Sequence, residues 1–88
     1  MGRDSTSDRD LRTLDGVPVK LSLRRVPVNA GGYDTGGAYW GTGEPLWLAT
    51  GDVDVLNVDG VTMFLRARDR DHAKSLVRAK LRAARFYR

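Results

Sequence analysis

The sequence contains no cysteine, one histidine and three prolines among its 88 residues. Without cysteine the chain cannot form a disulfide or a thiolate metal site, and it cannot use thiol catalysis. No apolar run approaches the roughly 18–20 residues that a membrane-spanning helix needs. The first eight residues are polar and hold no apolar signal core, so we expect the protein to reside in a reducing cytoplasm.

The length allows one hydrophobic core and therefore one domain. Hydrophobic residues at 41% and charged residues at 30% are typical of globular chains. Residues 1–15 are polar and contain Leu11 and Leu14 as their only sizeable apolar residues after Met1. We predict a flexible polar tail over residues 1–15 and a single domain over residues 16–88.

Charge is distributed unevenly along the chain, although the net charge is only +4. Residues 26–65 contain no lysine or arginine and carry five acidic side chains, whereas residues 66–88 carry nine basic side chains and two acidic ones. Because electrostatic fields act locally, this distribution predicts one acidic and one basic region on the surface. The alternative interpretation is that these charges only keep the protein soluble and form salt bridges between the two regions.

Residues 17–28 alternate apolar and polar side chains, which is the pattern of a half-buried strand, with Pro18 and Pro27 near its ends. Residues 46–49 form a short apolar run, and residues 53–67 read as a hairpin. The dipeptide Asp59-Gly60 suits a two-residue type I′ turn. In that register Val58 faces Val61, Leu56 faces Met63 and Val55 faces Phe64.

A helix is predicted over residues 69–83, capped by Asp69 or Asp71. The helical spacing of its apolar residues predicts a buried stripe. That stripe consists of Ala73, Leu76, Val77, Leu81 and Ala84. Residues 84–88 continue the helix or add a short strand. The predicted fold is α+β: a small antiparallel sheet of three to four strands, covered on one face by a single C-terminal amphipathic helix.

No catalytic constellation is recognisable in the sequence. His72 is surrounded by charged residues near the predicted helix start, and no serine has a histidine partner that the sequence places beside it. The glycines match neither phosphate-loop spacing, and the acids before Gly60 lack the spacing of a calcium loop. We therefore predict a protein that is not an enzyme and that uses no metal or cofactor.

The first candidate site is a glycine-rich segment, residues 29–43, which holds six of the ten glycines. A loop of this length in a small domain is usually functional or disordered, and large aromatics argue against disorder. Tyrosine and tryptophan dominate protein–protein hot spots. The predicted partner-binding residues are Tyr33, Asp34, Tyr39, Trp40 and Glu44. Whether the aromatic residues form an interface or complete the core stays open, whereas Trp47 is expected in the core.

The second candidate site is the basic face of the C-terminal helix. Its residues follow helical spacing and could contact nucleic-acid phosphates without reading sequence, unless they simply form a solvated face. They are Arg70, Lys74, Arg78, Arg82 and Arg85.

The segment from Arg24 to Trp47, which includes Gly-Gly-Tyr-Asp-Thr-Gly-Gly-Ala-Tyr-Trp-Gly-Thr-Gly-Glu-Pro-Leu-Trp, resembles a group of short proteins encoded in phages and prophages. The resemblance extends over residues 17–88, through Arg66-Ala67-Arg68-Asp69-Arg70 and the basic-aromatic end Ala84-Arg85-Phe86-Tyr87-Arg88. It implies a phage protein acting in the cytoplasm of a bacterial host. Small phage proteins of this size include anti-CRISPR inhibitors, which occupy a surface of a Cas effector.

Together these observations predict a small phage-type binding protein that acts stoichiometrically, as an anti-CRISPR inhibitor of a Cas effector complex. Its acidic, aromatic loop would dock in a basic nucleic-acid channel of the effector. The alternatives are direct nucleic-acid binding through the basic helix, as a regulatory or accessory phage protein, and a structural virion or assembly role with self-association.

Overall fold

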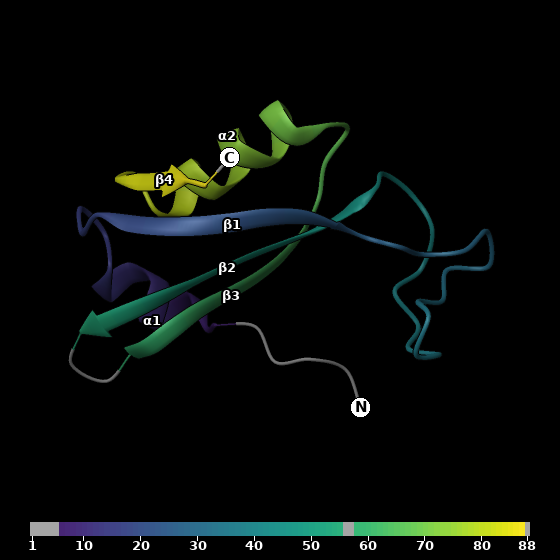
Figure 1. The fold of residues 1–88 in the computed structure, drawn as a ribbon, viewed down its shortest axis with the longest axis horizontal. Coiled ribbons are helices and arrows are strands. Elements are labelled where there is room, and N and C mark those ends of the chain that lie inside the picture. The colour runs from purple at the N-terminus through teal and green to yellow at the C-terminus, as the bar shows by residue number, and fades with distance from the viewer. Residues whose placement is uncertain (1–5, 56–57, 88) are drawn as a thin grey trace.

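The computed structural model describes residues 6–55 and 58–87, and this part of the chain forms two helices and four strands (Figure 1). In chain order they are α1 (Asp8–Thr13), β1 (Val19–Val26), β2 (Leu46–Val55), β3 (Val58–Arg66), α2 (Arg70–Lys80) and β4 (Ala84–Phe86). The sheet order is β3-β2-β1-β4. The predicted α+β plan of a small sheet with a C-terminal helix is confirmed.

The sheet is mixed rather than wholly antiparallel. β2 pairs antiparallel with β1 and with β3, but β4 pairs parallel with β1. The helix α2 carries the chain back along the sheet after β3, so the strand that follows runs in the same direction as β3 and β1. Residues 84–86 are therefore a strand, which decides between the two alternatives that the sequence left open.

β1 shows the predicted alternation and lies between Pro18 and Pro27. Val19, Leu21 and Leu23 are buried on one face of the sheet, while the intervening side chains are exposed. The same face of β2 and β3 contributes Trp47, Ala49, Val61 and Met63, and together with side chains from both helices these form the hydrophobic core. Sheet and helices are thus joined through one apolar layer.

The predicted turn at Asp59-Gly60 is wrong. Both residues lie inside β3, where Gly60 pairs with Asp52 of β2 and Val58 pairs with Val55. β2 extends over residues 46–55, with a register shift against β3 between Asp52 and Val55, and Val61 faces Gly51, Met63 faces Ala49 and Phe64 faces Leu48. The predicted pairing of Leu56 falls outside the described residues.

Helix α2 begins after Asp69, whose side chain accepts a hydrogen bond from the His72 amide, as expected of an N-cap. The helix is shorter than predicted and ends at Lys80. Ala73, Val77 and Leu81 are buried as expected, but Leu76 is 37% exposed, which corrects its assignment to the buried stripe. Leu76 lies about 100° around the helix from Val77, beyond the arc that meets the sheet.

Residues 6–15 differ from the predicted flexible tail, whereas the part of that prediction over residues 1–5 falls outside the described residues. Residues 8–13 form α1, capped by Ser7, and Leu11 and Leu14 are buried in the core at 4% and 0% exposure. Two leucines three residues apart place both side chains on one face of a single helical turn. That pattern is too short to register as amphipathic periodicity, but it suffices to attach the segment to the sheet.

Thr6 occupies part of the outer edge of β3. Its amide donates to the Thr62 carbonyl over 2.7 Å, and its hydroxyl oxygen accepts from the Thr62 amide over 2.8 Å. β3 is an outer strand of the sheet, so these two bonds satisfy backbone groups of Thr62 that no neighbouring strand reaches.

Candidate functional site: an ordered aromatic loop

The chain between β1 and β2 extends beyond the end of the sheet as a long loop (Figure 1). Its return to β2 is held by Arg66 at the end of β3. The Arg66 guanidinium donates to the backbone carbonyls of Glu44, Trp40 and Gly41 at 2.7, 2.7 and 3.0 Å. One arginine therefore fixes three successive points of the loop to the sheet.

Asp34 organises the interior of the loop. One of its carboxylate oxygens accepts from the amides of Gly36 and Ala38 at 2.9 and 3.0 Å, and the other accepts from the Trp40 indole nitrogen at 2.8 Å. Charge-assisted bonds of this kind are stronger than those between neutral groups. Although it is one of the predicted partner-binding residues, the Asp34 carboxylate is engaged within the loop itself.

Two glycines allow the outgoing and returning segments of the loop to approach each other closely. Gly32 and Gly41 have φ of +90° and +81°, and a Cβ on Gly32 would lie 2.8–2.9 Å from the backbone of Gly41. At this close approach the amides of Trp40 and Gly41 donate to the Gly32 carbonyl. The Asn29 side chain accepts from the Gly31 and Tyr33 amides and orders the first turn.

Trp40 anchors the loop to the sheet. Its ring packs against Phe64 of β3, with centroids 4.7 Å apart and planes inclined by 36°. Phe64 lies opposite Leu48 on the sheet face that the helices do not cover, so Trp40 helps to bury that end of the second face. Of the two roles left open for Trp40, the structure favours packing.

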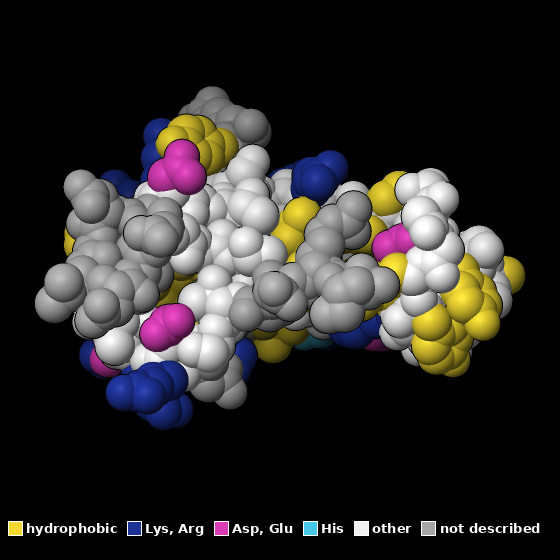
Figure 2. All heavy atoms as spheres, turned by 90° about the horizontal axis from the view of Figure 1, so that it is seen from below, with side chains coloured by type: hydrophobic (Ala, Val, Ile, Leu, Met, Phe, Trp, Pro, Cys, Tyr) yellow, Lys and Arg dark blue, Asp and Glu magenta, His cyan; other side chains and the backbone are white. Residues whose placement is uncertain are grey.

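Tyr33 and Tyr39 project from the same loop in a different manner. The two residues form a backbone bridge, and their rings are 5.0 Å apart and inclined by 55°. They remain 47% and 67% exposed, and apolar atoms gather at this end of the molecule in Figure 2. We call this pair the tyrosine tip. Together with the exposed Glu44, this pair is the part of the predicted site that is directed toward solvent.

The predicted acidic region is not a single surface. Glu44 is exposed at the loop end of β2, whereas Asp52 lies near the other end of that strand. At about 3.3 Å per residue the two positions are separated by some 25 Å. Hydrogen bonds hold the Asp34 carboxylate inside the loop without removing its charge, and the described acidic side chains are spread along the molecule rather than gathered into one acidic region.

The basic residues of the C-terminal segment also differ from the predicted stripe, because neighbouring groups hold most of them. Arg70 donates to the Leu23 carbonyl and lies 5.4 Å from the Trp47 ring, where Arg25 approaches as well. Arg85, on β4, is directed to the sheet face opposite α2, since its strand partner is Lys20. The five residues therefore do not form one solvated face of a helix.

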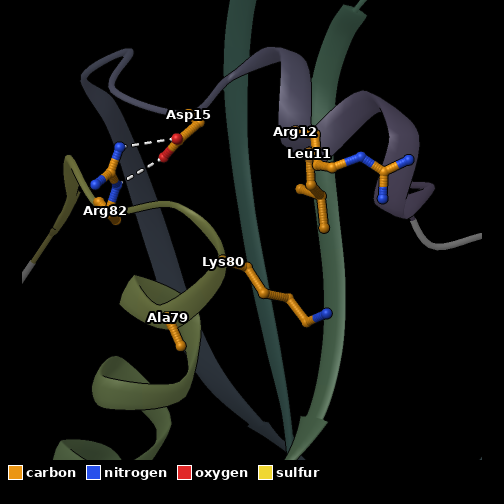
Figure 3. Close-up of a pocket in the computed structure, with 6 residues that line it drawn as sticks. All are labelled: Leu11, Arg12, Asp15, Ala79, Lys80 and Arg82. Carbon is orange, nitrogen blue, oxygen red and sulfur yellow. Dashed lines mark hydrogen bonds and ion pairs between the residues drawn. The ribbon is translucent and has the colours of Figure 1, made fainter.

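A groove that the sequence did not reveal separates α1 from α2 (Figure 3). Arg82 and Asp15 close one end through two hydrogen bonds of 2.9 and 2.8 Å. This bond to the Arg82 guanidinium lowers the pKa of the Asp15 carboxyl below its ordinary value. The sequence does not predict this groove, because α1 is too short to show an amphipathic pattern. Its volume is about 550 Å³, and its lining comprises Leu11, Arg12, Asp15, Ala79, Lys80 and Arg82.

The His72 side chain takes part in the local structure rather than standing alone. Its Nδ1 accepts from the Arg68 amide at 3.0 Å, at the turn that leads into α2. Within the described ranges, no three side chains of the histidine, aspartate or glutamate type come together as metal ligands. Neither described helix has the length and apolar character needed to cross a membrane.

The fold and the loop define a small α+β domain that presents an ordered aromatic loop at one end of its sheet. Comparison with protein-family models, with curated protein sequences and with solved structures finds no match. The functional argument therefore depends on the geometry of this chain.

Proposed function

We propose that this protein is a binding protein whose partner surface is the tyrosine tip, and that it acts by stoichiometric occupation of that partner. The observation that carries the proposal is the exposure of Tyr33 and Tyr39 on a loop that its own hydrogen bonds keep in one conformation. Association costs less free energy when the binding loop is already ordered. Tyrosine supplies a large contact area with few rotatable bonds.

The partner we propose is a Cas effector in the cytoplasm of a bacterial host, with this protein as an anti-CRISPR inhibitor. That choice of partner comes from the resemblance of the Arg24–Trp47 segment to short phage proteins. The contact would depend on ring packing and loop backbone more than on negative charge, because the Asp34 carboxylate is satisfied internally. Glu44 would act at the rim, where charges influence association rate more than affinity.

The test compares Tyr33→Ala and Tyr39→Ala with the loop controls Thr35→Ala and Thr42→Ala. Inhibition of Cas-dependent interference against phage is measured first, and the dissociation constant for the inhibited effector second. If either tyrosine is a hot spot, its removal weakens binding by roughly 2 kcal/mol, or about 30-fold, while the threonine variants bind like the parent. Trp40 variants are unsuitable, since they remove the Phe64 contact that holds the loop.

Two results would contradict different parts of the proposal. If both tyrosine variants are folded and inhibit as well as the parent, the tyrosine tip is not the interface. If the parent inhibits no Cas effector tested, the choice of partner is wrong. Capture from host lysate by the parent, compared with the Tyr33→Ala/Tyr39→Ala double variant, then determines whether the tip binds another protein.

A further inference from the structure

Basic side chains surround the short edge strand β4 on both sides. Lys74 and Arg78 reach it from α2, and Arg85 and Lys20 lie side by side on the opposite sheet face. We call these four residues the basic edge. Arg78 and Arg85, with Arg82, also line a shallow hollow of about 410 Å³ whose remaining wall is Pro18, Ala83 and Ala84.

Aromatic rings position the cations of the basic edge. The Lys74 Nζ and the Arg78 guanidinium lie 5.7 and 5.1 Å from the Phe86 ring centroid, and Arg78 Nε donates to the Ala84 carbonyl over 3.3 Å. On the other side, Lys20 Nζ lies 4.3 Å from the Tyr87 ring centroid. Such contacts restrict long side chains, so less conformational entropy is lost when an anion binds.

Acidic groups near the basic edge are few among the described residues. Asp15 forms an ion pair with Arg82 at the hollow, and Asp71 lies in the first turn of α2, almost two turns before Arg78. On the opposite sheet face, Asp52 lines a second hollow together with Lys20 and Tyr87. The basic edge thus keeps a concentrated positive charge, which attracts a polyanion in a salt-dependent way.

We infer that the basic edge binds the phosphate backbone of single-stranded nucleic acid, with one phosphate in the hollow between Arg78, Arg82 and Arg85. Tyr87 adds the second feature that single-strand sites use, because the residue is 54% exposed beside Lys20 and its ring can stack with a base. A single strand can bend around a short strand edge, whereas a duplex would have to meet cations on both faces of the sheet. This inference is independent of the tyrosine tip.

The test is fluorescence anisotropy with a labelled oligothymidylate of about 15 nucleotides, the matching duplex, and a polyglutamate peptide of similar charge. The double variant Lys74→Gln/Arg78→Gln is compared with Arg12→Gln/Arg68→Gln, which removes the same charge elsewhere. The first should weaken single-strand binding by about tenfold and the second by less than about twofold. Between about 50 and 200 mM salt, the slope of log affinity should become shallower by about 1.4 in the first variant only.

Because Arg78 also bonds to the Ala84 carbonyl, Lys20→Gln/Arg85→Gln provides a second variant whose side chains have no hydrogen bond to the described backbone. It should lose affinity similarly while melting like the parent. Equal losses in the edge and control variants would show a net-charge effect and overturn the site. Tighter binding of duplex or of polyglutamate would overturn the single-strand assignment, and no binding at about 50 mM salt would overturn the whole inference.

Discussion

The indole nitrogen of Trp40 donates a hydrogen bond to the carboxylate of Asp34 over 2.8 Å, while the Trp40 ring packs on Phe64 of β3. This contact connects the outer part of the loop to the sheet. The conformation of the tyrosine tip consequently depends on two residues that a partner need not touch.

Replacement of Asp34 by alanine tests this dependence. The change removes the acceptor for two backbone amides and one indole nitrogen, so we expect the free energy of unfolding to fall by about 1–3 kcal/mol. Urea denaturation measures the loss. Glu44→Ala is the control and should change stability by less than about 0.5 kcal/mol, because the loop uses only its backbone carbonyl. Equal stability of the two variants would argue against this role of Asp34.

A second prediction concerns the close approach at Gly32. Gly32→Ala combines a positive φ with a contact of 2.8–2.9 Å to the Gly41 backbone, so we expect a loss of about 1 kcal/mol or more and faster hydrogen exchange at the Trp40 amide. Gly36→Ala is the matched control, since its Cβ would meet only Asp34 Oδ1 at 3.5 Å. Normal exchange in the Gly32 variant would show that the loop tolerates a wider separation.

Leucine-to-alanine substitutions at Leu14 and Leu76 test the burial of two side chains. The sequence predicts Leu14 in a flexible tail and Leu76 in a buried stripe, whereas the structure buries Leu14 and exposes Leu76. Leu14→Ala should lower the free energy of unfolding by about 2–5 kcal/mol, because the side chain is fully buried. Leu76→Ala should cost less than about 1 kcal/mol at 37% exposure. Chemical denaturation of both variants provides the comparison, and a larger loss at Leu76 would be inconsistent with the described position of α1.

The Asp15–Arg82 pair predicts a pH dependence with a definite sign. The pKa of Asp15 is lowered in the folded protein by its bond to Arg82, so the pair contributes stability above the unfolded pKa of about 3.9. That contribution disappears as the pH falls through the folded pKa. NMR titration should show the Asp15 pKa rising in Arg82→Gln. It should stay unchanged in Arg12→Gln, whose side chain points away from the pair (Figure 3).

The strands and α2 could be predicted because their apolar residues repeat at the spacing of each element. The hairpin turn could not, because Asp59-Gly60 is a strong local turn signal that competes with the register of the whole sheet. Gly51 illustrates such a constraint from the rest of the sheet: a Cβ there would lie 2.6 Å from the Leu21 side chain and from the Lys20 carbonyl of β1. A glycine in the middle of a strand therefore fits β2 closely against β1, a requirement that no local pattern reveals.

The candidate loop could be predicted from its glycines and aromatic residues, but which aromatic residues are exposed and which pack on the sheet could not. Tyr39 and Trp40 are adjacent in sequence, yet one is exposed and the other packs on a strand that follows some twenty residues later. In the same way, helical spacing predicts that Lys74 and Arg78 lie on one face of the helix, but it does not predict that both contact the ring of Phe86 in β4. Contacts between distant segments decide both cases.

The bonds between Thr6 and Thr62 have a consequence for how copies of this protein meet one another. An uncovered outer strand can recruit the strand of a second molecule and start aggregation. Here the amide and carbonyl of Thr62 are already occupied near the middle of β3, while the opposite border of the sheet is a strand of only three residues. Continuous sheet growth from copy to copy is thus obstructed at both borders, so the exposed tyrosines of the loop are not accompanied by a long open sheet edge.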